Sequence, residues 1–298
     1  MTTNEHLTEA ELNRAPFAAG DIVVLHDRRR RRYRIPLRAG GRYSSHLGAV
    51  DHDAIIGQHE GFVIRTNRGH NLTALRPTFR ERVMDLPRQS QVVYPKDLGA
   101  LLMWLDLYPG AHVIECGLGS GAASSAILRA VGATGSLVSY EVRGEIVGPA
   151  KANIRKLVGE HHNHTVVVAD AYEAGFAERD VDRVLLDLAE PWRLADAAAA
   201  TLRLGGVVAA FMPTVLQVHQ MGMALSTDAR WRLIETVELI ERPWHVTDVS
   251  VRPEHRMVGH TGFIMTARRC EPAGEPEAAV FAETPSSDDV PAEDSGEL

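Results

Sequence analysis

The sequence predicts an α/β protein with a Rossmann-like, seven-stranded, mostly parallel sheet, preceded by a small N-terminal β-rich domain. From residue 97 onward, apolar runs of strand length alternate with segments of helical periodicity. Such alternation requires right-handed crossovers between parallel strands. A glycine-rich turn joins the first of these strands to the following helix. Between residues 17 and 78, short apolar runs are instead separated by turn signals, which is typical of hairpins.

Length and composition are those of an ordinary globular protein. The 298 residues are 45% hydrophobic and 24% charged, enough for one large domain and one smaller domain. No apolar run approaches the roughly 18 residues that span a membrane, and the polar N-terminus lacks the apolar segment of a signal peptide. Cys116 and Cys270 form neither a disulfide framework nor a metal cluster. We therefore expect a cytoplasmic protein with no membrane partner.

Composition shifts divide the chain into four segments. We expect a flexible leader over residues 1–16, a small β-rich module over 17–78, a large α/β domain over 79–270 and a disordered acidic tail over 271–298. The tail is rich in Pro, Glu, Ser and Asp, so it cannot bury enough apolar surface to order itself.

Charge is distributed unevenly along the chain. The net charge is −7, but the tail alone carries nine acids and no Lys or Arg. Residues 1–90 hold 15 arginines against 10 acids, and eight of these arginines lie between Arg28 and Arg42. This asymmetry suggests a polyanion as partner of the N-terminal part, although an arginine run is more often a solvated face or loop.

The elements of the large domain follow from hydrophobic periodicity and from Gly and Pro breaks. In order we expect a helix at 97–107, a strand at 112–116, a helix ending near 131, a strand at 137–140, a helix at 144–158, strands at 165–170 and 181–188, a helix at 192–204 stopped by Gly205-Gly206, a strand at 207–212, a helix at 214–225, and strands at 231–239 and 261–269. A long loop, 241–260, joins the last two strands, which we expect to form an antiparallel edge.

The glycine turn indicates an adenosine-containing ligand. Glycines let the backbone approach a ligand closely, the next helix offers unpaired N–H groups, and Glu141 at the end of the second strand can accept both ribose hydroxyls. A dinucleotide site favours a third glycine where this chain has Ala122. Glu115, before the turn, would repel a pyrophosphate but suits a positively charged amino-acid group. This pattern resembles class I S-adenosylmethionine methyltransferases and their seven-stranded methyltransferase sheet.

Four acids follow strands whose carboxyl ends should meet at one edge of the sheet: Glu115, Glu141, Asp170 and Asp187. We expect Glu141 to hold the ribose, Asp170 with Ala171 to face the adenine, and Glu115 to act on the methionine end of S-adenosylmethionine. Asp187 should lie nearest the transferred methyl group and the substrate. Each acid taken singly is also a common helix cap.

Several longer segments are similar to the tRNA adenine-58 N1-methyltransferases of bacteria and archaea. They are QVVYPKD (91–97), ECGLGSG (115–121), SYEVR (139–143), LLDLAEPW (185–192) and RPEHRMVGHTGF (252–263). The resemblance covers roughly residues 17–270; Cys116 and Leu118 depart from the family's usual residues. It implies formation of 1-methyladenosine in the tRNA T-loop, a homotetramer, and a β-rich module that helps to bind tRNA. The implied cofactor-binding residues are Gln91, Val93, Glu115, Gly117, Leu118, Gly119, Ser120, Gly121, Ala122, Glu141, Asp170, Ala171 and Asp187.

The implied chemistry needs neither a metal nor a covalent intermediate. Adenine N1 can attack the sulfonium methyl directly, so positioning supplies most of the catalysis, and the base must leave its stack. Asp187 could accept a hydrogen bond from the exocyclic amine and stabilise the developing positive charge. Tyr94 could stack on the base or bond to it; helix capping by Asp187 and core packing by Tyr94 are the simpler interpretations. We interpret His161, His162 and His164 as a polar loop, not a metal site.

Other functions remain open on the sequence. One is a non-catalytic RNA-binding subunit that keeps the fold, which the intact glycine turn and the four acids argue against. Another is a small-molecule methyltransferase or a nicotinamide-dependent oxidoreductase. Glu115 and the absent third glycine argue against the nicotinamide version.

Overall fold

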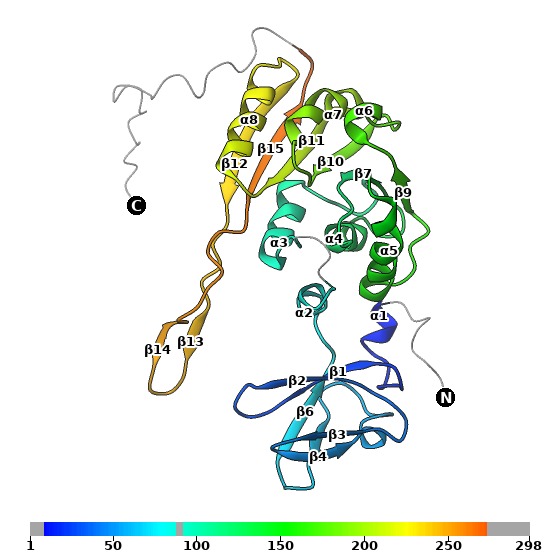
Figure 1. Ribbon diagram of the computed structural model, residues 1–298, viewed down its shortest axis with the longest axis vertical. Helices are drawn as coiled ribbons and strands as arrows, with labels where there is room; N and C mark the ends of the chain where they lie inside the picture. Colours follow the sequence, from blue (N-terminus) through cyan, green and yellow to red (C-terminus); the bar gives the residue numbers. More distant parts are fainter. Residues whose placement is uncertain (1–8, 88–91, 273–298) are drawn as a thin grey trace, which may run out of the picture. The chain divides into compact units, whose positions relative to one another are not determined.

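The computed structural model describes residues 9–87 and 92–272 (Figure 1). The chain divides into two compact units. The first runs to Pro95 and includes Gly119–Arg129 and Glu145–His162; the second comprises Lys96–Leu118, Ala130–Gly144 and the chain from Asn163 onward. Residue 91, most of the expected acidic tail and half of the expected leader lie outside the described residues.

The first unit contains the predicted β-rich strands. A four-stranded sheet has the order β2-β1-β6-β5 with antiparallel neighbours, and β3 and β4 form a separate antiparallel pair. Its elements before Pro95 are α1 (Glu9–Leu12), β1 (Ile22–His26), β2 (Arg32–Pro36), β3 (Arg42–Ser45), β4 (Gly48–Asp51), η1 (His52–Ala54), β5 (Val63–Arg65), β6 (Asn71–Leu75) and α2 (Phe79–Met84).

Burial explains why these short strands hold together. Val23 and Leu25 of β1 are fully buried and pack with Ile35, Leu72 and the preceding Phe17 in one apolar cluster. Helix α2 begins at a capping box, in which the Thr78 side chain accepts from the Glu81 backbone N–H and the Glu81 side chain accepts from that of Thr78.

The second unit carries the predicted seven-stranded sheet, in the order β12-β15-β11-β10-β7-β8-β9. Strands β11, β10, β7, β8 and β9 are parallel neighbours, and β15 runs antiparallel to β11 and β12. The Rossmann-like fold and the antiparallel edge are therefore confirmed. The elements are α3 (Pro95–Trp104), β7 (His112–Cys116), α4 (Ala122–Val131), β8 (Ser136–Glu141), α5 (Gly144–Val158), β9 (His164–Val168), α6 (Ala171–Ala174), β10 (Val181–Leu186), η2 (Pro191–Leu194), α7 (Ala195–Thr201), β11 (Leu202–Met212), α8 (Val215–Ser226), β12 (Trp231–Glu238), β13 (Trp244–Val246), β14 (Val251–Pro253) and β15 (Phe263–Arg269), where α4 and α5 belong wholly or largely to the first unit.

The strand order places a topological switch point between β7 and β10. From β7 the chain proceeds outward through β8 to β9, and it then returns to the other side of β7 as β10. The loops that leave β7 and β10 therefore diverge at their carboxyl ends. Ligands of open α/β sheets bind at such points.

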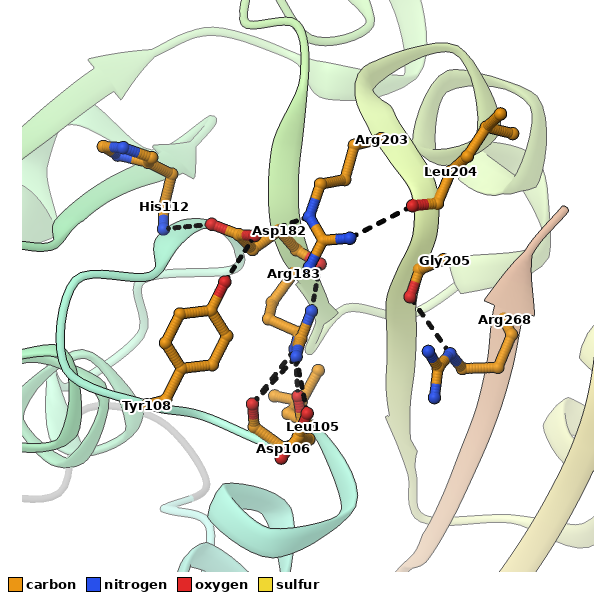
Figure 2. A network of polar contacts seen from close by, with 10 residues as sticks. All are labelled: Leu105, Asp106, Tyr108, His112, Asp182, Arg183, Arg203, Leu204, Gly205 and Arg268. Atoms are coloured by element: carbon orange, nitrogen blue, oxygen red, sulfur yellow. Dashed lines mark hydrogen bonds and ion pairs between the residues drawn. The ribbon is translucent and has the colours of Figure 1, made fainter.

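The opposite, amino end of these strands is fastened by a polar network (Figure 2). Asp182, at the start of β10, accepts hydrogen bonds from Tyr108 Oη (2.6 Å), the His112 backbone N–H (2.9 Å) and Arg203 Nε (2.7 Å). Burial alone would raise the pKa of Asp182, but these donors outweigh it and lower the pKa to about 2. The neighbouring Arg183 side chain is buried and donates to Asp106 Oδ2 at 2.7 Å. The network ties β7, β10 and β11 together away from the candidate site.

Two expected elements are wrong. The helix expected at 192–204 ends at Thr201, and β11 runs through Gly205-Gly206 instead of starting after them. The glycines form a bulge, because the register shifts between the pairs Val181–Leu202 and Arg183–Val207. A Cβ on Gly206 would lie 2.9 Å from the Arg203 carbonyl oxygen, so the strand needs glycine there.

The second error is the long loop 241–260. It contains a two-stranded hairpin, β13 and β14, in which Trp244 pairs with Pro253 and Val246 with Val251. In Figure 1 this hairpin, in orange, extends away from the sheet between β12 and β15. Each strand has only three residues, too few for a periodicity to be recognised.

Candidate active site

The four predicted acids gather around the end of β7. Cys116, its last residue, is 4% exposed. Burial is the main reason that the pKa of its thiol rises to about 12, and the negative charges of Glu115, Glu141, Asp170 and Asp187 raise it further. The carboxyl ends of β7, β8 and β10, with the segment after β9, therefore create one concentrated region of negative charge.

Gly117 brings three strand ends together. Its backbone N–H donates to the Tyr140 carbonyl oxygen at 2.9 Å, and the Asp187 N–H donates to the Cys116 carbonyl oxygen at 2.8 Å. The φ of Gly117 is +99°, and a Cβ there would overlap the carbonyl oxygen of Asp187. Glycine is required on both counts, which explains the turn that the sequence singled out.

Glu115 lies inside the sheet layer and not at its rim. It is fully buried, one residue before the end of β7. Its Oε2 accepts a hydrogen bond from Ser139 Oγ at 2.6 Å, and the same hydroxyl lies 2.9 Å from His164 Nε2. Neighbouring strands β7, β8 and β9 thus contribute one residue each to a polar row, in which Glu115 and Ser139 are buried and His164 is partly exposed. Ser139 and His164 were not among the predicted site residues.

Glu141 and Asp170 lie at the ends of the next two strands. Glu141 ends β8, is 5% exposed and accepts from the backbone N–H and Nε of Arg143, both at 3.1 Å. Asp170 is exposed and accepts from the Tyr172 N–H at 2.9 Å as the N-cap of α6. Ala171 begins that helix and is buried. The capping interpretation therefore applies to Asp170.

Asp187 follows the last residue of β10. Part of its surface reaches solvent, yet protein surrounds the carboxyl closely enough that burial raises its pKa to about 7. It caps neither of the helices that follow, because the N-cap positions of η2 and α7 are Glu190 and Leu194. A carboxyl group that titrates near neutrality at a topological switch point is typical of functional sites.

The remaining predicted residues are held differently. Leu118, in the second unit, is 2% exposed. In the first unit, Ser120 and Ala122 are buried, and a Cβ on Gly121 would lie 2.7 Å from Ile154 Cγ1. Gly121 and the preceding Gly119 both have positive φ, and the Ser120 carbonyl oxygen accepts from Asn153 Nδ2 at 3.1 Å. Within this unit, the beginning of α4 is therefore packed against α5. Of the motif before α3, Val93 is buried and Tyr94 is half-buried, whereas Gln91 lies outside the described residues.

Comparison with known proteins identifies the family. The family described as tRNA methyltransferase complex GCD14 subunit matches residues 72–258, more than half of the chain, and the TrmI-like N-terminal family matches residues 16–64. Over 247 residues the chain is 34% identical to the tRNA (adenine(58)-N(1))-methyltransferase TrmI of Thermus thermophilus, which covers 83% of this chain and 96% of that protein. The chain belongs to the GCD14/TrmI family.

Other members and neighbours agree with this assignment. The tRNA (adenine(57)-N(1)/adenine(58)-N(1))-methyltransferase TrmI of Methanocaldococcus jannaschii is 30% identical over 270 residues, covering 82% of this chain and 94% of that protein. A SAM-dependent O-methyltransferase from Thermotoga maritima superposes with a TM-score of 0.80 at 32% identity, covering 88% of this chain and 97% of the other. TrmI from Aquifex aeolicus shares the fold, with a TM-score of 0.76 at 24% identity and coverage of 86% and 99%.

Within this GCD14/TrmI chain, the YPKD motif has a structural role that sequence reasoning missed. Lys96 Nζ donates to Asp97 Oδ1 (2.7 Å), the Leu239 carbonyl oxygen (2.7 Å) and Thr261 Oγ1 (2.6 Å). Thr261 Oγ1 in turn donates to Asp97 Oδ2 at 2.7 Å, and Asp97 is fully buried. This network joins α3 to the base of the β13–β14 hairpin. The presence of Lys96 and Asp97 in the YPKD motif was the one feature of the sequence that could have indicated this role.

His260, at the same base, is held at both ring nitrogens. Nδ1 lies 2.7 Å from Glu238 Oε1 and Nε2 lies 2.7 Å from the Pro213 carbonyl oxygen. Both partners are acceptors, so the geometry requires a doubly protonated ring. The Pro213 carbonyl and then the Glu238 carboxylate raise the pKa of His260 accordingly.

Neither a membrane span nor a metal site is found among the residues that the structure describes. None of their helices combines the length and the apolar character that a membrane span needs. No group of three or more His, Cys, Asp or Glu among them has the arrangement of a metal site.

Proposed function

We propose that this chain transfers a methyl group from S-adenosylmethionine to N1 of adenine 58 in the T-loop of tRNA. One observation carries the proposal: the similarity to TrmI of Thermus thermophilus extends over 96% of that protein. The position of Asp187 at the switch point between β7 and β10 supports it independently.

The charges of the site suit S-adenosylmethionine, which supplies an electrophilic methyl group on a cationic sulfonium. Four acids surround the end of β7, and a bound cation would favour the ionised form of Asp187. Glu141 would accept the ribose hydroxyls, Asp170 and Ala171 would border the adenine, and Glu115 would act on the methionine end, directly or through water. The glycine turn, Gly117 to Ala122, and the motif residues Gln91 and Val93 would complete the cofactor-binding set.

The chain's catalytic contribution would be positional and electrostatic. Adenine N1 carries a lone pair and loses no proton when it is alkylated, so no general base is needed. Asp187, once ionised, would accept a hydrogen bond from the exocyclic amine and stabilise the positive charge that the base acquires. Tyr94 would stack on the extruded base or bond to it. Orientation of the base toward the methyl group would supply most of the rate enhancement.

We propose a homotetramer, as the family resemblance implies, and, from the composition, a cytoplasmic location. The β13–β14 hairpin supports an association, because Trp244, Val246, Val249 and Val251 are each about half exposed or more. Apolar surface of this kind is typical of protein–protein contacts. Sedimentation equilibrium tests the assembly: a single monomeric species at micromolar concentration would contradict it.

A direct assay tests the activity. The chain is incubated with an unmodified tRNA transcript and methyl-labelled S-adenosylmethionine, and the RNA is then digested to nucleosides. We expect labelled 1-methyladenosine. The matched control is the same transcript with guanine at position 58, which should take up no label. Label at another nucleoside, or in the control transcript, would refute the assignment.

One neighbour favours a second candidate, a small-molecule methyltransferase acting on oxygen, because the Thermotoga maritima protein is described as a SAM-dependent O-methyltransferase. Oxygen methylation requires a hydroxyl to lose its proton, and Asp187 with a pKa of about 7 could accept it. Methylation of small phenols at a rate comparable to that of tRNA would favour this alternative.

A further inference from the structure

Three turns of the first unit's β-strands pack together at one end. Arg31 Nη1, in the β1–β2 turn, donates to His46 Nε2 in the β3–β4 turn at 2.6 Å. Thr66 Oγ1, in the β5–β6 turn, donates to the Leu47 carbonyl oxygen at 2.7 Å, and Arg68 Nη1 donates to that of His46 at 3.2 Å. We call this region the arginine end and define it as residues 27–31, 46–47 and 65–70.

The arginine end is strongly basic. It holds six arginines and two histidines against a single acid, Asp27. The arginines are Arg28, Arg29, Arg30, Arg31, Arg65 and Arg68, and all but Arg31 are exposed. Such a density of one sign on a small folded surface creates a field that attracts polyanions.

The one acid shapes the turn that carries four of these arginines. Asp27 is 4% exposed, and its Oδ1 accepts from the backbone N–H groups of Arg29 (2.8 Å) and Arg31 (2.9 Å). Its Oδ2 accepts from Arg31 Nε at 2.6 Å. Burial would raise the pKa of Asp27, but these donors lower it. Arg30 takes a left-handed conformation, with φ of +63°. The turn therefore has a fixed shape that leaves Arg28 and Arg29 in solvent.

Three later arginines of the same run are paired with carboxylates. Arg32 pairs with Glu81 at 2.7 Å, Arg34 with Asp85 at 3.1 Å and Arg42 with Asp51 at 3.4 Å. Within the described part of the chain, Arg28 and Arg29 take part in no such ion pair. Arg32, Arg34 and Arg42 are therefore held by carboxylates, whereas Arg28 and Arg29 are directed to solvent at the arginine end.

We propose that the arginine end binds the phosphate backbone of tRNA, using residues other than those proposed to receive the target base. The proposal rests on the proposed function, since it takes tRNA as the substrate. A guanidinium matches a phosphate in geometry and forms two parallel hydrogen bonds with it. Phosphate contacts fix register and orientation and carry no sequence information. The arginine end therefore contributes affinity for tRNA of any sequence, whereas the residues around Asp187 select the base.

The test compares two double variants of the full chain with equal change in charge. Arg28→Gln/Arg29→Gln removes two solvent-directed arginines, and Arg32→Gln/Arg34→Gln removes two that are paired with Glu81 and Asp85. Binding to a fluorescently labelled, unmodified tRNA transcript is measured by anisotropy between 50 and 300 mM KCl. Calorimetric titration with S-adenosylmethionine reports whether each variant keeps its cofactor site.

We expect the first variant to bind tRNA about tenfold more weakly at 100 mM KCl, with the slope of log K against log salt reduced by about 2. The control should bind within about twofold of the unaltered chain. KM for tRNA should rise in the first variant while kcat at saturating tRNA stays unchanged. Unaltered affinity and salt slope in a first variant that still methylates tRNA would overturn the proposal, as would an equal loss in the control. If the unaltered chain neither binds nor methylates tRNA, the proposed function itself fails.

Discussion

Replacing Asp187 by Asn should stabilise the protein, and the gain should grow with pH. The carboxyl of Asp187 has a pKa of about 7 in the folded chain against 3.8 in a solvated one. Between these values the folded state binds more protons than the unfolded state, so the free energy of unfolding falls as pH rises. By linkage, the raised pKa of Asp187 lowers the free energy of unfolding by about 1.5 kcal/mol at pH 5, where the carboxyl ionises only in the unfolded chain, and by about 4 kcal/mol at pH 8. The Asn variant escapes this cost.

Urea denaturation followed by tryptophan fluorescence measures the effect at pH 5, 6.5 and 8 without cofactor. The quantity of interest is the difference in unfolding free energy between Asp187→Asn and the unaltered chain, because all other titrating groups cancel in it. This difference should shift in favour of Asn by about 2.5 kcal/mol between pH 5 and pH 8. Asp187→Ser should show the same shift, since it also removes the carboxyl. A difference that is constant across this range would refute the reasoning.

Three further predictions follow from the same contacts. The rate of methyl transfer at limiting S-adenosylmethionine should rise with pH through about 7 as Asp187 ionises, and at saturating S-adenosylmethionine the midpoint should lie at lower pH because the bound cation favours the carboxylate. Asp187→Asn should lower the rate by on the order of a hundredfold or more in a single-turnover assay; an activity that falls between pH 6 and about 8 would contradict the role. Asp182→Asn should lower the free energy of unfolding by about 2 kcal/mol at pH 7, because a pKa of about 2 gives stability that is present above pH 4 and lost toward pH 2; denaturation at pH 7 and pH 3 checks this, and an equal effect at both would exclude it. Gly117→Ala should abolish calorimetric binding of S-adenosylmethionine, whereas Gly132→Ala, also at positive φ but with no atom within 4 Å of the added Cβ, should cost only about 1 kcal/mol of stability and keep binding.

The sequence predicted the parallel sheet well, because buried strands and their intervening helices leave a strong periodic signal. Gly117 could be singled out for a physical reason that the structure bears out: a left-handed turn in contact with the chain at Asp187. The gathering of the strand-end acids followed from sheet geometry alone, and the shared influence of all four on Cys116 agrees with it.

The errors share a different origin. Gly205-Gly206 serves as a bulge only because the register of β10 and β11 shifts there, and pairing between strands is not visible in a local pattern. The β13–β14 hairpin is too short to show alternation. The contact of Ser139 with Glu115 joins residues 24 apart on neighbouring strands, and no spacing in the sequence reports it. Each of these features depends on contacts between strands in the folded chain, which a local sequence pattern does not contain.

The three acceptors around Lys96 use all the hydrogen-bond donors of the only basic residue in the YPKD motif. An ammonium group has three N–H bonds, and here each one already ends on an oxygen of the protein. This lysine therefore has no donor left to offer an incoming phosphate, and turning outward would remove the positive charge beside the fully buried carboxylate of Asp97, which would keep only the hydrogen bond from Thr261. In this chain the basic side chain of the YPKD motif therefore has a structural role: it holds α3 to the residues that flank the β13–β14 hairpin.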